Sequence, residues 1–274
     1  MKNRVLSGVV LVALMLAIVI FNHSFPLALN IVLALVSLFS ITELISAIGM
    51  TKKYFLAIPS VLFAAGLPLV ELELLQEGLY YVYTVVLFAS LIRYHKEATF
   101  REVGIIYSMT LLIPTALMTL LELRKLGGNH GMFYVMMAIF SAWIADVGGF
   151  FAGSLFGKHK LCPEISPRKT VEGVAGGFVL NIAAMLVFGW IFSSVFYQGT
   201  VQVSYLTLLL MGIGSTIFSI LGDLSFSLIK RSCHIKDFGQ VIPGHGGILD
   251  RFDSVIFTVP YVFFLVQILP LVIK

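Results

Sequence analysis

Apolar residues occur in stretches long enough to cross a bilayer. A spanning helix needs about 17–25 mostly apolar residues. Nine stretches meet or approach that length, namely residues 5–21, 27–49, 54–70, 78–92, 103–121, 131–156, 174–197, 203–229 and 254–273. The fourth is short for a span, and Gly66 and Pro68 interrupt the third, so the range is eight to ten. The pattern predicts an all-α, polytopic integral membrane helical bundle with about nine transmembrane helices.

The positions of the basic residues orient this bundle. Nine helices with a cytoplasmic N-terminus place fifteen of the eighteen Lys and Arg residues on the inner side, as the positive-inside bias predicts. Only Arg124, Lys125 and Lys274 then lie outside. With one span fewer, the basic residues would no longer gather on one side of the membrane. No small-x-small cleavage site follows the first apolar stretch, so we expect it to be retained as a helix.

Composition strengthens the membrane assignment. The mean hydropathy is +1.00, and 59% of residues are apolar while 12% are charged, about half the usual share. These values exclude an ordinary water-soluble domain. The sequence pI near 9.0 follows from the basic inner loops, so we expect no nucleic-acid partner. Cys162 and Cys233 fall in predicted cytoplasmic loops without a CxxC pair, which indicates reduced thiols that bind no metal.

The two halves of the chain differ in polarity. Residues 1–130 read as a scaffold of plain spans that faces lipid or a second subunit, and the only acid inside one of these spans is Glu43, whose role the sequence does not indicate. Residues 131–274 carry polar residues within spans. This half also contains two long basic loops, 157–173 and 230–253, both predicted to be cytoplasmic. We therefore expect the chemistry in the second half.

Asp223 lies in the middle of an apolar helical stretch. An Asp in a span costs roughly 3 kcal/mol, so a functional role is the favoured interpretation. Polar residues share its helix face at spacings of four or three, namely Ser215, Ser219, Ser227 and Lys230. For the serines, a polar seam between helices is at least as good an explanation.

A second acidic pair begins the last span. Asp250 and Asp253 are three residues apart, so a helix projects both to one side. Taken alone, they fit a helix N-terminus, where the macrodipole favours acids. With Asp223 available from another helix, a Mg²⁺ site becomes the better hypothesis, because such oxygen ligands suit this ion. The preceding glycines, including Gly246 and Gly247, would let a phosphate approach backbone N–H groups.

The other basic loop presents Arg168 and Lys169 in a Ser-Pro-Arg-Lys turn, where they suit phosphate binding. Lys158 and Lys160 are better explained as anchors beside anionic lipid. Asp146 is a further acid within a span, and Gly149 and Gly153 beside it are spaced for close helix packing.

Two stretches carry a family resemblance. The run from Ser227 through Lys230, Arg231, Lys236 and Asp237 to the segment PGHGGILDRFD resembles the signature of the phosphatidate cytidylyltransferases, also called CDP-diacylglycerol synthases. The stretch SPRKTVEG, residues 166–173, resembles the same family. The order of the spans also resembles that family, so the resemblance covers the whole chain, and it departs at none of the signature's charged positions.

This resemblance implies a reaction of CTP with phosphatidate, giving CDP-diacylglycerol and pyrophosphate. It implies an integral inner-membrane enzyme that faces the cytoplasm, requires Mg²⁺ with a second cation such as K⁺, and forms homodimers. The implied metal ligands are Asp223, Asp250 and Asp253. The implied catalytic set is Asp223, Asp250, Lys230, Arg231, Lys236, Asp237 and His245. The implied substrate-binding set is Asp146, Ser166, Arg168, Lys169, Glu172, Ser227, Gly246, Gly247 and Arg251, and a plain turn histidine is an alternative interpretation of His245.

Three other classes compete with this interpretation. A cation transporter also has many spans and buried acids, but these acids cluster toward the cytoplasmic edge. A CDP-alcohol phosphotransferase would carry a DGxxAR…GxxxD motif, which the sequence lacks. A CTP-dependent lipid kinase would use the same nucleotide and release CDP.

Overall fold

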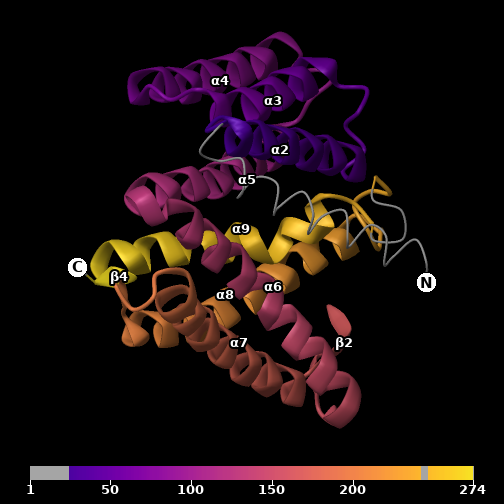
Figure 1. Cartoon of the computed structure of the whole chain (residues 1–274). Helices are drawn as coiled ribbons and strands as arrows, with labels where there is room; N and C mark the ends of the chain where they lie inside the picture. Colours follow the sequence, from indigo (N-terminus) through magenta and orange to yellow (C-terminus); the bar gives the residue numbers. More distant parts are fainter. Residues whose placement is uncertain (1–24, 242–245, 274) are drawn as a thin grey trace. The chain divides into compact units, whose positions relative to one another are not determined.

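The computed structural model describes residues 25–241 and 246–273. Its α-helices are α2 (Ala28–Ala47), α3 (Tyr54–Gly66), α4 (Glu73–Arg93), α5 (Phe100–Leu126), α6 (Gly131–Phe156), α7 (Val171–Ile191), α8 (Tyr205–Ser232) and α9 (Leu249–Ile268). The short helical turns are η1 (Leu67–Leu69), η2 (Gly128–His130) and η3 (Phe192–Phe196). The strands are β1 (Lys160–Cys162), β2 (Ser166–Thr170), β3 (Gln202–Val203) and β4 (Val272–Ile273). Helices dominate, which confirms the predicted all-α class (Figure 1).

Most of the predicted spans correspond to observed helices. In the described part of the chain, seven helices are long and apolar enough to cross a membrane, namely α2 and α4 to α9. The third predicted span is a shorter apolar helix, Tyr54–Leu69. The fourth, which looked short in the sequence, belongs to a 21-residue helix, α4. The first, residues 5–21, lies outside the described residues. The total of nine and the orientation remain predictions.

Large apolar side chains cover the outer faces of these helices. Ile92 is 76% exposed, Phe150 is 70% exposed and Val179 is 71% exposed. Such a surface is unfavourable in water and favourable against hydrocarbon. The helices therefore form an integral membrane protein, as the composition predicts.

The chain forms two compact units. Unit 1 comprises Met1–Met118 and Cys233–Phe252, and unit 2 comprises Thr119–Ser232 and Asp253–Lys274. The segment that leads into α9 thus belongs to the same unit as α2, although it is far from α2 in sequence. This division differs from the functional division at residue 130 inferred from the sequence.

Unit 1 is held by helix packing with a few polar links. Helix α3 packs against both α2 and α4. Asn30 Nδ2 donates to the Pro68 carbonyl over 2.9 Å, which ties α2 to η1. The buried hydroxyls of Ser60 and Tyr83 lie 3.0 Å apart and link α3 to α4. Hydrogen bonds of this kind satisfy polar groups that hydrocarbon would leave without partners.

In unit 2, α6 and α7 approach closely because glycines line their contact. A Cβ added at Gly148 would lie 2.9 Å from the Gly176 carbonyl oxygen. A Cβ added at Gly173 would lie 2.7 Å from the Gly149 carbonyl oxygen, and one at Gly153 would lie 2.9 Å from Thr170 Oγ1. These contacts confirm the close packing predicted for Gly153, whereas a Cβ at Gly149 would meet its nearest atom, the Gly173 carbonyl oxygen, at an ordinary 3.7 Å.

Helix α8 packs against both α6 and α7 in the same unit (Figure 1). Asn181 on α7 is fully buried, and its Nδ2 donates to the Gly212 carbonyl and to Thr216 Oγ1 on α8, each over 3.1 Å. The three helices therefore form one packed body that carries Asp146 and Asp223.

Candidate active site

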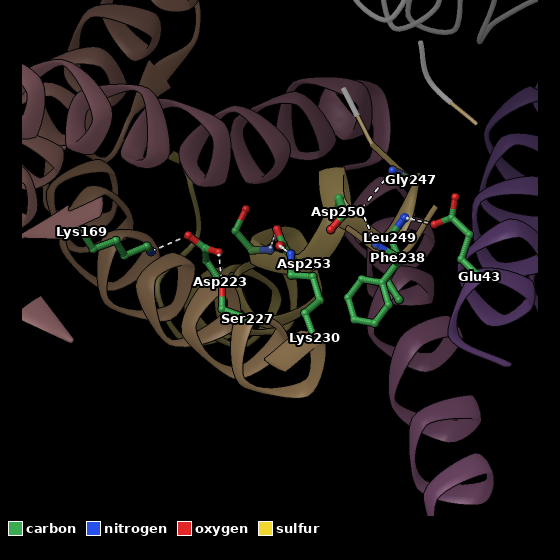
Figure 2. A network of polar contacts seen from close by, with 11 residues as sticks. Glu43, Lys169, Asp223, Ser227, Lys230, Phe238, Gly247, Leu249, Asp250 and Asp253 are labelled. Atoms are coloured by element: carbon green, nitrogen blue, oxygen red, sulfur yellow. Dashed lines mark hydrogen bonds and ion pairs between the residues drawn. The ribbon is translucent and has the colours of Figure 1, made fainter. Parts of the chain in front are cut away.

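Asp223 and Lys169 form the first ion pair of the site. Lys169 Nζ lies 2.6 Å from Asp223 Oδ2, and Ser227 Oγ donates to Asp223 Oδ1 over 3.2 Å (Figure 2). Asp223 comes from α8 and Lys169 from β2. The sequence predicted that both residues are functional, and unit 2 brings them together.

A small β-hairpin holds Lys169 in place. Strands β1 and β2 pair antiparallel just before α7. Thr170 caps α7 by accepting a hydrogen bond from the Gly173 amide over 3.1 Å, which fixes the end of β2 against the helix. Lys169 immediately precedes this cap, so its backbone position is set by the junction of hairpin and helix.

Glu172 ties the start of the hairpin to the first turn of α7. Its carboxylate accepts hydrogen bonds from the Lys158 amide over 3.0 Å and from His159 Nδ1 over 2.6 Å. Glu172 also lies at a helix N-terminus, where the macrodipole favours an acid. The sequence resemblance assigned Glu172 to substrate binding. Its observed contacts support the loop that presents Lys169, and direct substrate contact remains a prediction.

A second acid–lysine pair lies where α8 meets α9. Lys230 Nζ is 3.7 Å from Asp253 Oδ2, and both side chains are about nine-tenths buried, with side-chain exposures of 11% and 10% (Figure 2). Asp253 Oδ1 accepts a hydrogen bond from the Ser254 amide over 2.8 Å. Buried charges need such partners, because a lone charge in this environment is costly.

Gly222 allows α9 to come this close to α8. A Cβ at this position would lie 2.6 Å from the Asp253 carbonyl oxygen and 3.1 Å from Ser254 Cα. Both atoms belong to the backbone of α9, so a side chain at residue 222 would push the helices apart. Because Gly222 directly precedes Asp223, the same contact limits the distance between Asp223 on α8 and Asp253 on α9.

Asp146 adds a third carboxylate. Its Oδ1 accepts a hydrogen bond from Ser219 Oγ over 2.8 Å, which joins α6 to α8. Asp146, Asp223 and Asp253 lie close enough to interact electrostatically with one another. With all three ionised, Lys169 and Lys230 leave one negative charge uncompensated within this cluster.

The donor chemistry of this cluster fits Mg²⁺. Carboxylate oxygens are the ligands that this ion prefers, and the acidic excess favours a cation. In the ranges 25–241 and 246–273, no three His, Cys, Asp or Glu side chains are already arranged around a common point. Asp223 and Asp253 instead contact lysines, so metal binding would require these carboxylates to turn from Lys169 and Lys230 toward a shared ion.

Asp250 is anchored within unit 1. Its Oδ2 accepts hydrogen bonds from the Phe238 amide over 2.8 Å and from the Gly247 amide over 3.0 Å (Figure 2). Gly246 has a φ of +83°, which favours glycine, and a Cβ there would lie 3.1 Å from Asp250 Oδ2. The sequence predicted that the Gly247 amide binds phosphate. In the structure this amide donates to the Asp250 carboxylate.

A sequence model of the cytidylyltransferase family matches residues 2–269. The chain belongs to this family.

Several relatives within the cytidylyltransferase family align over nearly their full length. A Bacillus subtilis protein named phosphatidate cytidylyltransferase is 35% identical over 98% of this chain and 98% of its own length. Proteins of the same name from Staphylococcus epidermidis and Staphylococcus saprophyticus are 32% and 30% identical, each over 95% of this chain and 96% of its own length. The resemblance inferred from the two motifs is confirmed.

The remaining predicted site residues of this cytidylyltransferase-family chain occupy varied positions. Arg168, Arg231, Lys236 and Asp237 are exposed, whereas Ser227 is buried and Ser166 and Arg251 are partly buried. His245 lies outside the described residues. Their contacts with substrate remain predictions.

The sequence singled out Glu43 as an isolated acid within a span but indicated no role for it. Glu43 on α2 contacts the segment that leads into α9, where Asp250 lies. The only signal in the sequence was its isolation, because an acid within an otherwise apolar span requires a specific partner. Its partners are backbone amides, which no side-chain pattern reveals.

Proposed function

We propose that this chain transfers CMP from CTP to phosphatidate, giving CDP-diacylglycerol and pyrophosphate. The supporting observation is the cluster of Asp146, Asp223 and Asp253 with Lys169 and Lys230, built from membrane helices and one polar hairpin. The two lysines, together with a cation held by the carboxylates, would neutralise the charge of anionic substrates. Relatives named phosphatidate cytidylyltransferase, which align over nearly the whole chain, support the choice of substrates.

The reaction needs little covalent help from the protein. A phosphate oxygen of phosphatidate attacks the α-phosphorus of CTP, and a new P–O–P link forms. The bond from the α-phosphorus to the bridging oxygen breaks, and its electron pair leaves with pyrophosphate. Because the attacking group is already an anion, no strong general base is required. Positioning and charge neutralisation therefore dominate.

Lys169 and Lys230 are suited to hold the phosphates. Each ammonium group contacts a carboxylate, 2.6 Å away for Lys169 and 3.7 Å away for Lys230. A bound triphosphate would compete for these ammonium groups as the stronger anion. Arg168 and Lys236 are both exposed, and each would offer a mobile positive charge to an arriving CTP.

Mg²⁺ is part of this proposal, with Asp223, Asp250 and Asp253 as its ligands. The chemistry that the ion supplies when bound is neutralisation of charge on the triphosphate and on the leaving pyrophosphate. Asp146, held by Ser219, would line the polar cavity that receives the substrates, and a second cation such as K⁺ would accompany the Mg²⁺. We further propose a cytoplasmic site in the inner membrane, reached by lipid from the inner leaflet, and a homodimeric enzyme.

The decisive experiment uses purified full-length protein in detergent with CTP labelled at the α-phosphate, phosphatidate and Mg²⁺. Labelled CDP-lipid should form together with unlabelled pyrophosphate, and only when phosphatidate is present. Labelled CDP without CDP-lipid would identify a lipid kinase and contradict the proposal. Unconsumed CTP, with cation uptake into vesicles that contain the protein, would favour a transporter.

A further inference from the structure

Glu43 is a buried acid that reaches across unit 1 to the start of α9. Its side chain belongs to α2, and the residue is only 6% exposed. Its Oε1 accepts a hydrogen bond from the Ile248 amide and its Oε2 accepts one from the Leu249 amide, each over 2.9 Å (Figure 2). Both carboxylate oxygens are thus engaged by successive backbone amides.

These contacts offset the cost of an acid within a span. An acid in a membrane helix costs about 3 kcal/mol on insertion scales. The N-terminus of α9 supplies unsatisfied N–H groups and the positive end of the helix dipole. Glu43 satisfies two of these donors and compensates that partial charge, which explains why an isolated carboxylate is tolerated in α2.

The surrounding backbone is shaped to admit this carboxylate. A Cβ added at Gly247 or at Gly239 would overlap the Glu43 carboxylate. Glycine at both positions therefore makes room for the acid on either side. The position of the Glu43 carboxylate therefore depends on the segment that leads into α9. This lead-in comprises Phe238, Gly239 and Gly246–Leu249.

The carboxylates of Glu43 and Asp250 share the amides of this lead-in. Asp250 accepts from Gly247, and Glu43 accepts from the next two residues, Ile248 and Leu249. Asp250 also accepts from Phe238. Three successive amides are thus held by two acids, so the orientation of the first turn of α9, and with it the Asp250 side chain, depends on Glu43.

We propose that Glu43 is a positioning residue that fixes the first turn of α9 and thereby orients Asp250 for the reaction. This inference rests on the proposed function, in which Asp250 is a metal ligand. Both carboxylate oxygens of Glu43 are engaged by backbone amides, so in this proposal it acts through Asp250 and not on a substrate. A purely structural cap would affect how much folded protein is recovered. A positioning residue also changes how the folded protein uses CTP.

The first test measures amide hydrogen exchange in the full-length protein in detergent, without substrates. In Glu43→Gln, one amide keeps an oxygen acceptor and the other faces an NH₂ group. Exchange over residues 247–250 should accelerate about tenfold or more, because a buried donor loses its partner. Glu97→Gln is the matched control, since Glu97 is an exposed acid of the same unit. It should leave exchange over these residues unchanged.

The second test measures steady-state kinetics. Glu43→Gln should lower kcat/KM for CTP about tenfold or more and change KM for phosphatidate less than twofold, because Asp250 serves the nucleotide side. Gly239→Ala provides an independent variant, since its new Cβ displaces the Glu43 carboxylate without removing the charge. The double variant should be little worse than either single variant, as expected for residues that act together.

The outcomes separate this inference from the proposed function. Unchanged exchange over residues 247–250 in Glu43→Gln would show that Glu43 does not hold the first turn of α9, whatever the activity of the variant. Accelerated exchange with unaltered kcat/KM for CTP would reduce Glu43 to a structural cap. If the unmodified protein forms no CDP-lipid, the proposed function fails, while the exchange experiment still decides whether Glu43 holds α9.

Discussion

Lys169 Nζ lies 2.6 Å from Asp223 Oδ2, and the two side chains retain 20% and 29% of their exposure. An ion pair that water still reaches contributes little to stability, typically about 0–1 kcal/mol. The ion pair therefore does not offset the free-energy cost of placing Asp223 in a span, so stability alone does not account for this residue. A pair that is close, charged and accessible is suited to exchange partners when an anionic substrate and a cation arrive.

Replacing Asp223 with Asn should abolish CMP transfer while leaving a folded membrane protein. Asn keeps the shape of the side chain but loses the charge that would hold a metal. We expect a loss of about 1000-fold or more, since several kcal/mol of charge stabilisation correspond to a factor of that order. CDP-lipid formation measures the effect, and gel filtration in detergent measures folding.

Glu164→Gln is the charge-matched control for Asp223→Asn, because Glu164 is exposed on the hairpin loop. It should retain near-normal transfer. Near-normal transfer by Asp223→Asn itself would refute the metal assignment of Asp223.

Lys169→Ala should lower kcat/KM for CTP by about 10- to 100-fold, the range expected for losing a charge-assisted hydrogen bond. Its melting temperature should change little, because the pair is partly exposed. Lys160→Ala makes the same change on the other strand of the hairpin, where the residue is exposed and interpreted as a lipid anchor. Equal kinetic defects in the two variants would show that Lys169 has no specific role.

Gly222→Ala should separate α8 from α9. The new Cβ would meet the Asp253 carbonyl oxygen at 2.6 Å, and backbone atoms cannot yield as a flexible side chain does. We expect a destabilisation of about 1–3 kcal/mol, typical of overpacking, together with reduced CMP transfer. Thermal unfolding in detergent and CDP-lipid formation measure these effects.

The control for Gly222→Ala is Gly149→Ala in α6, where the nearest atom to the new Cβ lies at 3.7 Å, an ordinary contact. It should be close to neutral in both assays. A fully active and stable Gly222→Ala protein would show that the close approach of α8 and α9 is not needed for the site.

The sequence predicted two kinds of feature, namely patterns that recur along the chain and single residues with a high energetic cost at their position. The length of the apolar stretches predicted the spans, because the thickness of the hydrocarbon core sets the length of a spanning helix. Asp223 was identified because a charge within a span is expensive. The sequence identified Arg168 and Lys169 as a defined basic pair in the loop 157–173, but it predicted a turn there, whereas both residues lie on strand β2. The spacing of Gly149 and Gly153 predicted a close contact beside Asp146, which the structure confirms at Gly153 and not at Gly149.

Contacts between distant segments could not be predicted from the sequence. Glu43 and Leu249 are 206 residues apart, and the partner of Glu43 is a backbone amide that any residue could supply. Nor does the sequence distinguish an acid that holds a loop from one that binds a ligand. Glu172, assigned to substrate binding by resemblance, makes its observed hydrogen bonds to Lys158 and His159.

The predicted orientation can be tested with the protein's own cysteines. Cys162 and Cys233 are partly exposed, and both fall in loops that the positive-inside bias assigns to the cytoplasm. A membrane-impermeant maleimide should label them in inside-out vesicles and not in right-side-out vesicles. As a control, Asn129→Cys in a cysteine-free chain places a thiol at an exposed position between α5 and α6, predicted to face outward, and should label with the opposite preference. Labelling of Cys162 or Cys233 from outside would invert the topology and place the lysine and carboxylate cluster on the side of the membrane where CTP is not supplied.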